Sequence, residues 1–137
     1  MKYLLDTNAV SAVMKADPHF TARLRSLSPI DVAVPQPVWA ELSYGIERLA
    51  DSRRKRALED ALRLVRTELP TVPWTDDVSD AFGTIKASLE ARGARIEDFD
   101  CAIAAHAVAL RLVLVTANET HMARVSGLTI EDWSRRG

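Results

Sequence analysis

Three acidic residues and one asparagine are the side chains in this sequence best placed to do chemistry together. Asp6 follows a short apolar stretch near the start of the chain, and Asn118 follows another near its end. Glu41 and Asp100 each fall in the first turn of an expected helix. Oxygen donors of this kind suit the hard cations Mg²⁺ and Mn²⁺. Two such ions about 4 Å apart can hold the attacking and leaving oxygens when a phosphodiester is cleaved.

These side chains can meet only if the fold brings the ends of several elements to one place. Apolar stretches predict strands at residues 3–5, 30–34, 71–74, 112–116 and 128–133. Helical patterns predict helices at residues 9–15, 18–27, 37–49, 76–93, 99–111 and 120–125, and one more after residue 51. This alternation favours an α/β fold, a three-layer α/β/α sandwich with a mostly parallel central sheet. The carboxyl ends of its strands would share one edge, where ligand sites form.

Local residue choices predict where some of these elements end. Asp17, directly before a proline, and Thr75, directly before two aspartates, are typical of residues that cap the start of a helix. Asp51 is expected to cap the helix that follows it. Pro73 lacks a backbone donor, so we expect its strand at an edge of the sheet.

Two aspartates near the start of helix 99–111 have to be distinguished. Side chains two residues apart on a helix point about 200° apart, so Asp98 and Asp100 cannot both reach one ion from a regular helix. We expect Asp98 to cap the helix and Asp100 to lie within its first turn. The helix dipole would stabilise Asp100 there even without a ligand.

The other candidates also have ordinary structural explanations. Asp6 could simply cap the next helix, and Glu41 could lie on a solvated helix face. Glu41 falls at the edge of an apolar stripe, one turn before Gly45, which leaves open space beside the carboxylate. Alternatively, Gly45 could let a neighbouring helix pack closely. The histidines lack the spacing of a metal-binding pair, so we expect structural or surface roles for them.

The composition is that of one globular domain. The length of 137 residues and the mass of 15.2 kDa favour a single domain spanning residues 1–137. The apolar runs are shorter than the roughly 20 residues that cross a bilayer, and the first one meets Asp6 too early for a secretory signal. We therefore expect a cytoplasmic protein without membrane association. A single cysteine, Cys101, excludes an internal disulfide and a cysteine-rich zinc site.

The charge balance offers nucleic acids no overall attraction. The chain has 18 Lys and Arg against 19 Asp and Glu, a net charge of −1. A polyanionic partner must therefore be attracted by a local patch or by bound cations. The basic residues between Arg48 and Arg66 are interleaved with acids, which is typical of a solvated helix face.

Five stretches, in this order, resemble the motifs of one protein family. They are YLLDTN at residues 3–8, WAELSYG at 39–45, DCAIAAHA at 100–107, LVTAN at 114–118 and VSGLTIEDW at 125–133. Together they cover essentially the whole chain. The sequence resembles PIN-domain ribonucleases, specifically the VapC-type toxins of bacterial toxin–antitoxin pairs.

The resemblance implies a specific set of site residues. Asp6, Glu41 and Asp100 match the invariant acids of the family, and Asn118 falls where the family often has a fourth acid or an asparagine. Asp6 and Asp100 would hold Mg²⁺, with Mn²⁺ as a substitute. Glu41 and Asn118 would complete the site or position the attacking water. The same motifs add two residues that would support the ligands or position water, Asn8 and Thr116.

The resemblance also implies an activity and its partners. The activity is endonucleolytic cleavage of RNA, such as tRNA or rRNA, which leaves a 3′-hydroxyl and a 5′-phosphate. A small antitoxin is expected to lay a tail across the helices and to place an arginine among the site carboxylates. We also expect a homodimer, partly because Trp39 and Tyr44 put two large aromatic side chains on one short helix.

Two other functions are open to a chain of this kind. A HAD-type phosphatase also has an aspartate at the end of its first strand, but it needs a second acid at the position that Asn8 occupies here. A non-catalytic binding module could keep the fold and lose the chemistry. The retained Asp6, Glu41 and Asp100 argue against that module, which would show no loss of RNA that depends on Mg²⁺ or Mn²⁺.

Overall fold

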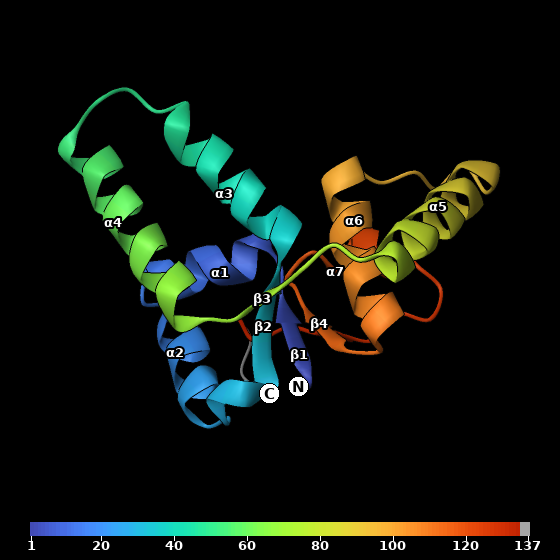
Figure 1. Ribbon diagram of the computed structural model, residues 1–137, viewed down its shortest axis with the longest axis horizontal. Coiled ribbons are helices and arrows are strands. Elements are labelled where there is room, and N and C mark those ends of the chain that lie inside the picture. The colour runs from blue at the N-terminus through green and yellow to red at the C-terminus, as the bar shows by residue number, and fades with distance from the viewer. Residues whose placement is uncertain (135–137) are drawn as a thin grey trace.

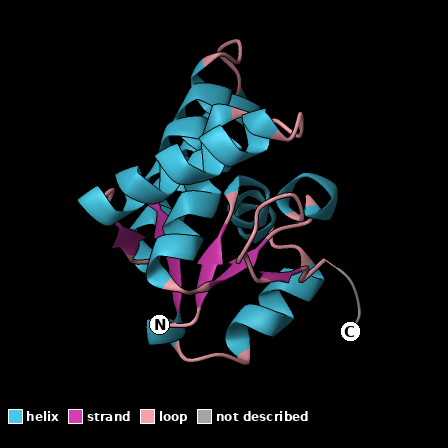
Figure 2. Ribbon diagram, turned by 90° about the vertical axis from the view of Figure 1, so that its right-hand side faces the viewer, coloured by secondary structure: helices cyan, strands magenta, loops and turns pink. Residues whose placement is uncertain are grey.

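The computed structural model describes residues 1–134, and at its centre is a five-stranded sheet in the order β3-β2-β1-β4-β5. The strands are β1 (Tyr3–Leu5), β2 (Val32–Pro35), β3 (Thr71–Val72), β4 (Val113–Val115) and β5 (Ile130–Glu131). Helices cover both of its sides (Figures 1 and 2). They are α1 (Thr7–Met14), α2 (Pro18–Arg25), α3 (Gln36–Glu47), α4 (Arg53–Glu68), α5 (Asp76–Ala91), α6 (Asp98–Leu110) and α7 (Glu119–Met122). The predicted α/β/α sandwich is confirmed, and every strand pair in the described chain is parallel.

The strand order reverses at β1, which creates one special edge at the centre of the sheet. The chain runs outward from β1 through β2 to β3, and then returns to β4 on the other side of β1. β1 and β4 end level, because Leu5 pairs with Val115 and the Asp6 N–H donates to the Val115 carbonyl at 3.1 Å. Ligand sites of parallel sheets form at such a reversal. Asp6 and Thr116, which directly follow these two strands, lie at this edge.

Two helices flank this edge from opposite sides. α1 packs against α2, α3 and α4, whereas α6 packs against α5 and β4. α3 contacts both α1 and α6, and with α4 it forms a helical hairpin that projects beyond the sheet (Figure 1). Residues 101–107 of α6 are all buried, and most of them are alanine. Because these side chains are small, α6 can lie close to the sheet.

Some strand ends differ from the predicted ones. β2 begins at Val32 rather than Ile30, because Pro29–Asp31 forms a 3₁₀ turn in which Ile30 is exposed. β3 ends at Val72, and the following Pro73 cannot continue the ladder. Among the strands of residues 1–134, β3 pairs only with β2, so its predicted place at an edge of the sheet is confirmed.

Two predicted helix caps are confirmed and two are wrong. Asp17 and Thr75 accept hydrogen bonds from backbone N–H groups of α2 and α5. Ser52, not Asp51, caps α4, because its hydroxyl accepts from the Lys55 N–H at 3.1 Å. Asp98 is not a cap either, since it is already the first residue of α6.

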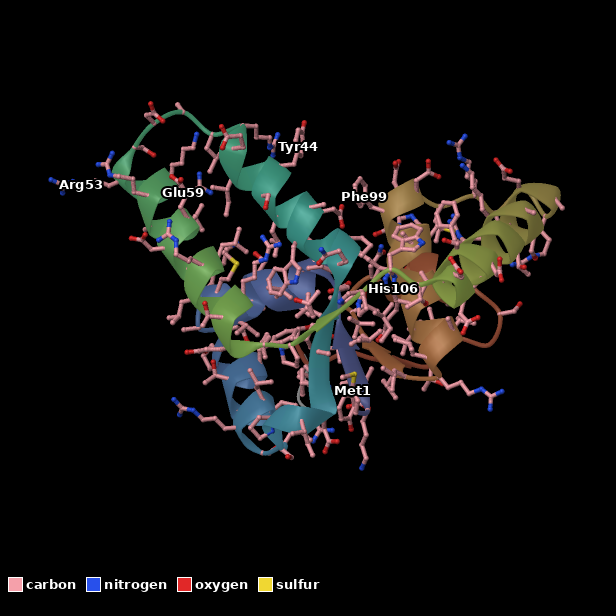
Figure 3. All side chains as sticks on the ribbon, in the orientation of Figure 1. Met1, Tyr44, Arg53, Glu59, Phe99 and His106 are labelled. Atoms are coloured by element: carbon pink, nitrogen blue, oxygen red, sulfur yellow. The ribbon has the colours of Figure 1, made fainter. Side chains whose placement is uncertain are left out.

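Trp39 lies in the core rather than on an interface. Its side chain is buried, and its indole N–H donates to the Thr71 hydroxyl at 2.9 Å. Tyr44 is 71% exposed and remains available to a partner (Figure 3). Across residues 1–134 we find no helix with the length and apolar character needed to span a bilayer.

Candidate active site

Asp6 caps a helix and is also buried at the edge of the sheet. Its carboxylate accepts the Ala9 N–H at 2.8 Å and so caps α1. The same side chain is only 4% exposed and accepts a hydrogen bond from the Thr116 hydroxyl. The cap and Thr116 together fix the carboxylate at the point where the strand order reverses.

The electrostatics of Asp6 indicate that Glu41 and Asp100 lie near it. Burial raises the pKa of Asp6 from 3.8 to about 6, because desolvation disfavours the charged form. The hydrogen bonds from Thr116 and Ala9 lower the pKa, and the negative charges of Asp100 and Glu41 raise it. The carboxylates of Glu41 on α3 and Asp100 on α6 therefore both repel the Asp6 charge.

Glu41 reaches the site from α3. It lies in the second turn of the helix, not in the first as expected, because α3 begins at Gln36. The Thr7 hydroxyl donates to one Glu41 carboxylate oxygen at 2.5 Å, which ties α3 to the start of α1. A methyl group added at Gly45 would find no heavy atom within 4 Å, so the alternative of close helix packing at Gly45 is wrong.

Asp100 reaches the site from the first turn of α6, as expected. Burial raises its pKa; the nearby His121 lowers it, and Glu97 raises it. Asp98 turns away from the site, and its carboxylate pairs with the Lys86 ammonium at 3.0 Å. The two aspartates thus have different surroundings, and Asp98 forms an ion pair rather than the expected helix cap.

Asn118 is joined to the acids through Thr116. Its backbone N–H donates to the Thr116 hydroxyl oxygen at 2.9 Å, and that hydroxyl in turn hydrogen-bonds Asp6. Its side-chain oxygen accepts from Nδ1 of His121 at 2.9 Å. Sequence reasoning missed His121; its spacing of three residues from Asn118, which places both on one face of a helical turn, was the available signal.

Asn8 lies apart from the acids. Its side chain is exposed and lines a cavity along α1 with Ser11 and Lys15. In the described part of the chain, Asn8 makes no side-chain hydrogen bond to any of the acids. Its role in supporting ligands or positioning water stays a prediction.

The donor set fits a hard divalent cation. Asp6, Glu41 and Asp100 contribute only oxygen atoms, and within residues 1–134 none of them pairs with a Lys, Arg or His side chain within 4.0 Å. Their mutual repulsion would be relieved by a cation. No group of three or more His, Cys, Asp and Glu in that range is arranged to hold an ion by itself. Mg²⁺ suits this arrangement, because it commonly binds one or two carboxylates and keeps several waters.

Comparison with known proteins identifies the family. The PIN domain model matches residues 3–128. Ribonuclease VapC2 of Haemophilus influenzae is 34% identical, with 97% of this chain and 98% of the relative covered. The tRNA(fMet)-specific endonuclease VapC of Salmonella typhimurium is 29% identical over 97% of this chain and 98% of its own.

A solved structure agrees with these relatives. The crystal structure of VapBC2 from Rickettsia felis, bound to a DNA fragment from their promoter, contains a chain that is 28% identical to this one. It superimposes with a TM-score of 0.86 over 97% of this chain and 99% of the other. The interpretation as a HAD-type phosphatase is therefore wrong. This chain matches the family model and resembles these relatives along its whole length. It therefore belongs to the PIN-domain family and, within it, to the VapC ribonucleases.

Proposed function

We propose that this chain is a Mg²⁺-dependent endoribonuclease of the cytoplasm and the toxin of a toxin–antitoxin pair. One observation carries the proposal: a buried aspartate at the reversal of the sheet feels two further carboxylates and has no cationic side chain beside it in the described chain. Such a cluster is costly for a folded protein unless a bound cation compensates it. A non-catalytic module would have no reason to retain it.

The mechanism divides the work among the site residues. Asp6 and Asp100 would hold the ion, which lowers the pKa of bound water and neutralises charge on the phosphate. Thr116 orients the Asp6 carboxylate through its hydroxyl. Thr7 occupies one oxygen of Glu41, which leaves the other free to accept a proton from the attacking water. Asn118, held by His121, would orient that water.

The substrate we propose is a structured RNA, and tRNA is the first one to test. A relative that is 29% identical along almost the whole chain is named a tRNA(fMet)-specific endonuclease. Attack of water on phosphorus with cleavage of the bond to the 3′ oxygen, which leaves as an alcohol after it takes up a proton, gives a 3′-hydroxyl and a 5′-phosphate. Sequencing the 5′-phosphate ends of cellular RNA after brief induction should show ends concentrated at few sites. Ends that match those of uninduced cells would contradict the proposal.

The partner we propose is a small antitoxin. Its arginine, placed among Asp6, Glu41 and Asp100, could pair bidentately with a carboxylate and displace the metal. Expression of the neighbouring small reading frame should restore growth to cells that produce this chain. Continued arrest, with both proteins present, would count against an antitoxin role for that frame.

A further inference from the structure

Three arginines from separate segments are linked by hydrogen bonds near the start of α6. Arg92 follows α5, Arg95 lies in the connection to α6, and Arg124 follows α7. The Arg92 guanidinium donates to the Arg124 carbonyl at 2.6 Å, and the Arg124 guanidinium donates to the Arg95 carbonyl at 3.0 Å. These bonds tie the α5–α6 connection to the segment after α7. The bonds hold the Arg92 and Arg124 guanidinium groups in place, and Arg95 takes part through its backbone carbonyl.

The positive charges of this arginine cluster (Arg92, Arg95 and Arg124) are not neutralised by acids. Within residues 1–134, none of the three comes within 4.0 Å of a carboxylate oxygen. Their contacts to backbone carbonyls leave the formal charges in place. On α4, Lys55 pairs with Asp51 and Arg63 pairs with Asp60, whereas Arg53 makes no ion pair in the described part of the chain. The location of the charges therefore decides between the two groups. Arg95 lines a cavity together with Asp100, which makes its cluster the better candidate for the local patch that a chain of net charge −1 needs to attract a polyanion.

A cavity extends from Arg95 of the cluster to Asp100. Its volume is about 470 Å³, and it is lined by Arg95, Ile96, Glu97, Asp100 and His121. Sites for small ligands commonly measure about 300–1,000 Å³, so the cavity can hold a nucleotide-sized group. Its lining is acidic at Glu97 and Asp100 and basic at Arg95. A cation at the acidic part and a phosphate at the basic part would both find an opposite charge.

We propose that Arg95, supported by Arg92 and Arg124, is a subsite for a backbone phosphate of the RNA strand next to the phosphodiester that is cleaved. A guanidinium matches a phosphate because it can donate two parallel N–H bonds to its oxygens. The subsite contacts the strand before and after cleavage equally, so it contributes binding rather than chemistry. This inference rests on the proposed ribonuclease activity and adds a substrate contact to it.

The test compares Arg95→Gln with Arg53→Gln in the full chain. Both substitutions remove one exposed positive charge, but Arg53 lies at the outer end of the α3–α4 hairpin, far from α6 (Figure 3). With bulk tRNA and Mg²⁺, Arg95→Gln should raise KM about tenfold and leave kcat within about twofold. Arg53→Gln should leave both constants unchanged. Equal constants for wild type and Arg95→Gln, or an equal rise in KM for both variants, would overturn the subsite.

A binding measurement separates the subsite from the nuclease activity. Fluorescently labelled tRNA is titrated with each protein in EDTA at several salt concentrations. Arg95→Gln should bind tRNA about tenfold more weakly than the wild type. The slope of log K against the logarithm of the salt concentration should also be shallower by about 0.7–0.9. If the wild type cleaves nothing with Mg²⁺ or Mn²⁺, the proposed function fails while this comparison still decides the subsite. Binding that is unchanged in Arg95→Gln, with only inhibition by the antitoxin lost, would assign the cluster to the antitoxin and overturn the proposal.

Discussion

Asp6 has two opposing effects on the stability of the fold. Its side chain caps α1, which stabilises the helix, but it is buried next to two other carboxylates, which raises its pKa to about 6. Above that pH the folded protein must hold a buried charge that the unfolded chain holds in water. The charged Asp6 carboxylate therefore destabilises the metal-free protein, and a bound cation would compensate its charge.

Asp6→Asn should stabilise the metal-free protein at neutral pH. The folded pKa of about 6 lies above the unfolded value of 3.8, so charging Asp6 lowers the free energy of unfolding as pH rises through this window. The full effect, reached above the folded pKa, is about 3 kcal/mol. Asn still caps α1, because its amide oxygen accepts a hydrogen bond as Asp does. Urea unfolding in EDTA should show the gain near pH 7.5 and little near pH 4.

The opposite pattern would contradict this account of Asp6. A variant that is less stable than wild type near pH 7.5 would mean that the Asp6 charge stabilises the fold. A gain of the same size at both values of pH would point to packing rather than to charge.

Asp98 and Asp100 should respond differently to metal. We expect Mg²⁺ to bind the folded protein through Asp100, so it should raise the melting temperature of the wild type and of Asp98→Asn but not of Asp100→Asn. The loss of the exposed Asp98–Lys86 ion pair should cost at most about 1 kcal/mol. Melting curves with and without Mg²⁺ decide the matter. A Mg²⁺ response that disappears in Asp98→Asn and persists in Asp100→Asn would reverse the two roles.

Features of the helices that depend on neighbouring residues could be predicted from the sequence, whereas features that depend on contacts between distant residues could not. Asp17 and Thr75 were predictable as caps, because a cap depends on residues a few positions away. The choice between Asp51 and Ser52 was not, since adjacent residues compete for one position and the turn before the helix decides. The bond between Thr7 and Glu41 joins residues 34 positions apart and follows only from the packing of α1 on α3.

The sequence predicts more of the residues of the candidate site than of the residues that surround it. Asp6, Glu41 and Asp100 fall in motifs that resemble a known family, and the structure brings the three together. His121 carries no such motif, and the arginine cluster is assembled from segments that only the fold unites. The three acids could be predicted because the edge of a parallel sheet brings such residues together. The positions of His121 and the arginines depend on loop geometry, which the sequence does not reveal.

Ser52→Ala should destabilise the protein more than Asp51→Ala. The Ser52 hydroxyl satisfies a backbone N–H of α4, and its removal should cost about 1 kcal/mol. Asp51 is 98% exposed at its side chain, and its ion pair with Lys55 is long, at 3.8 Å. Urea unfolding of the two variants gives the comparison. An equal loss in both, or a larger one in Asp51→Ala, would return the cap to Asp51.

At the scale of the whole molecule, we expect a homodimer. Trp39 no longer supports this, because it is part of the core. Tyr44 does, since a large aromatic side chain that is 71% exposed is typical of interface residues. Light scattering at micromolar concentration should give the mass of two chains, and Tyr44→Asp should shift it toward one. A stable monomer of wild type would remove the dimer.

We propose that the acids at the sheet edge hold the cation on which RNA cleavage depends. The most direct measurement is the rate of tRNA cleavage by the wild type and by Asp100→Asn as Mg²⁺ is added to metal-free protein. The wild type should be inactive in EDTA and should gain activity with Mg²⁺ until the rate saturates, while Asp100→Asn stays inactive and folded. Cleavage by the wild type in EDTA, or cleavage by Asp100→Asn at the wild-type rate, would contradict the account.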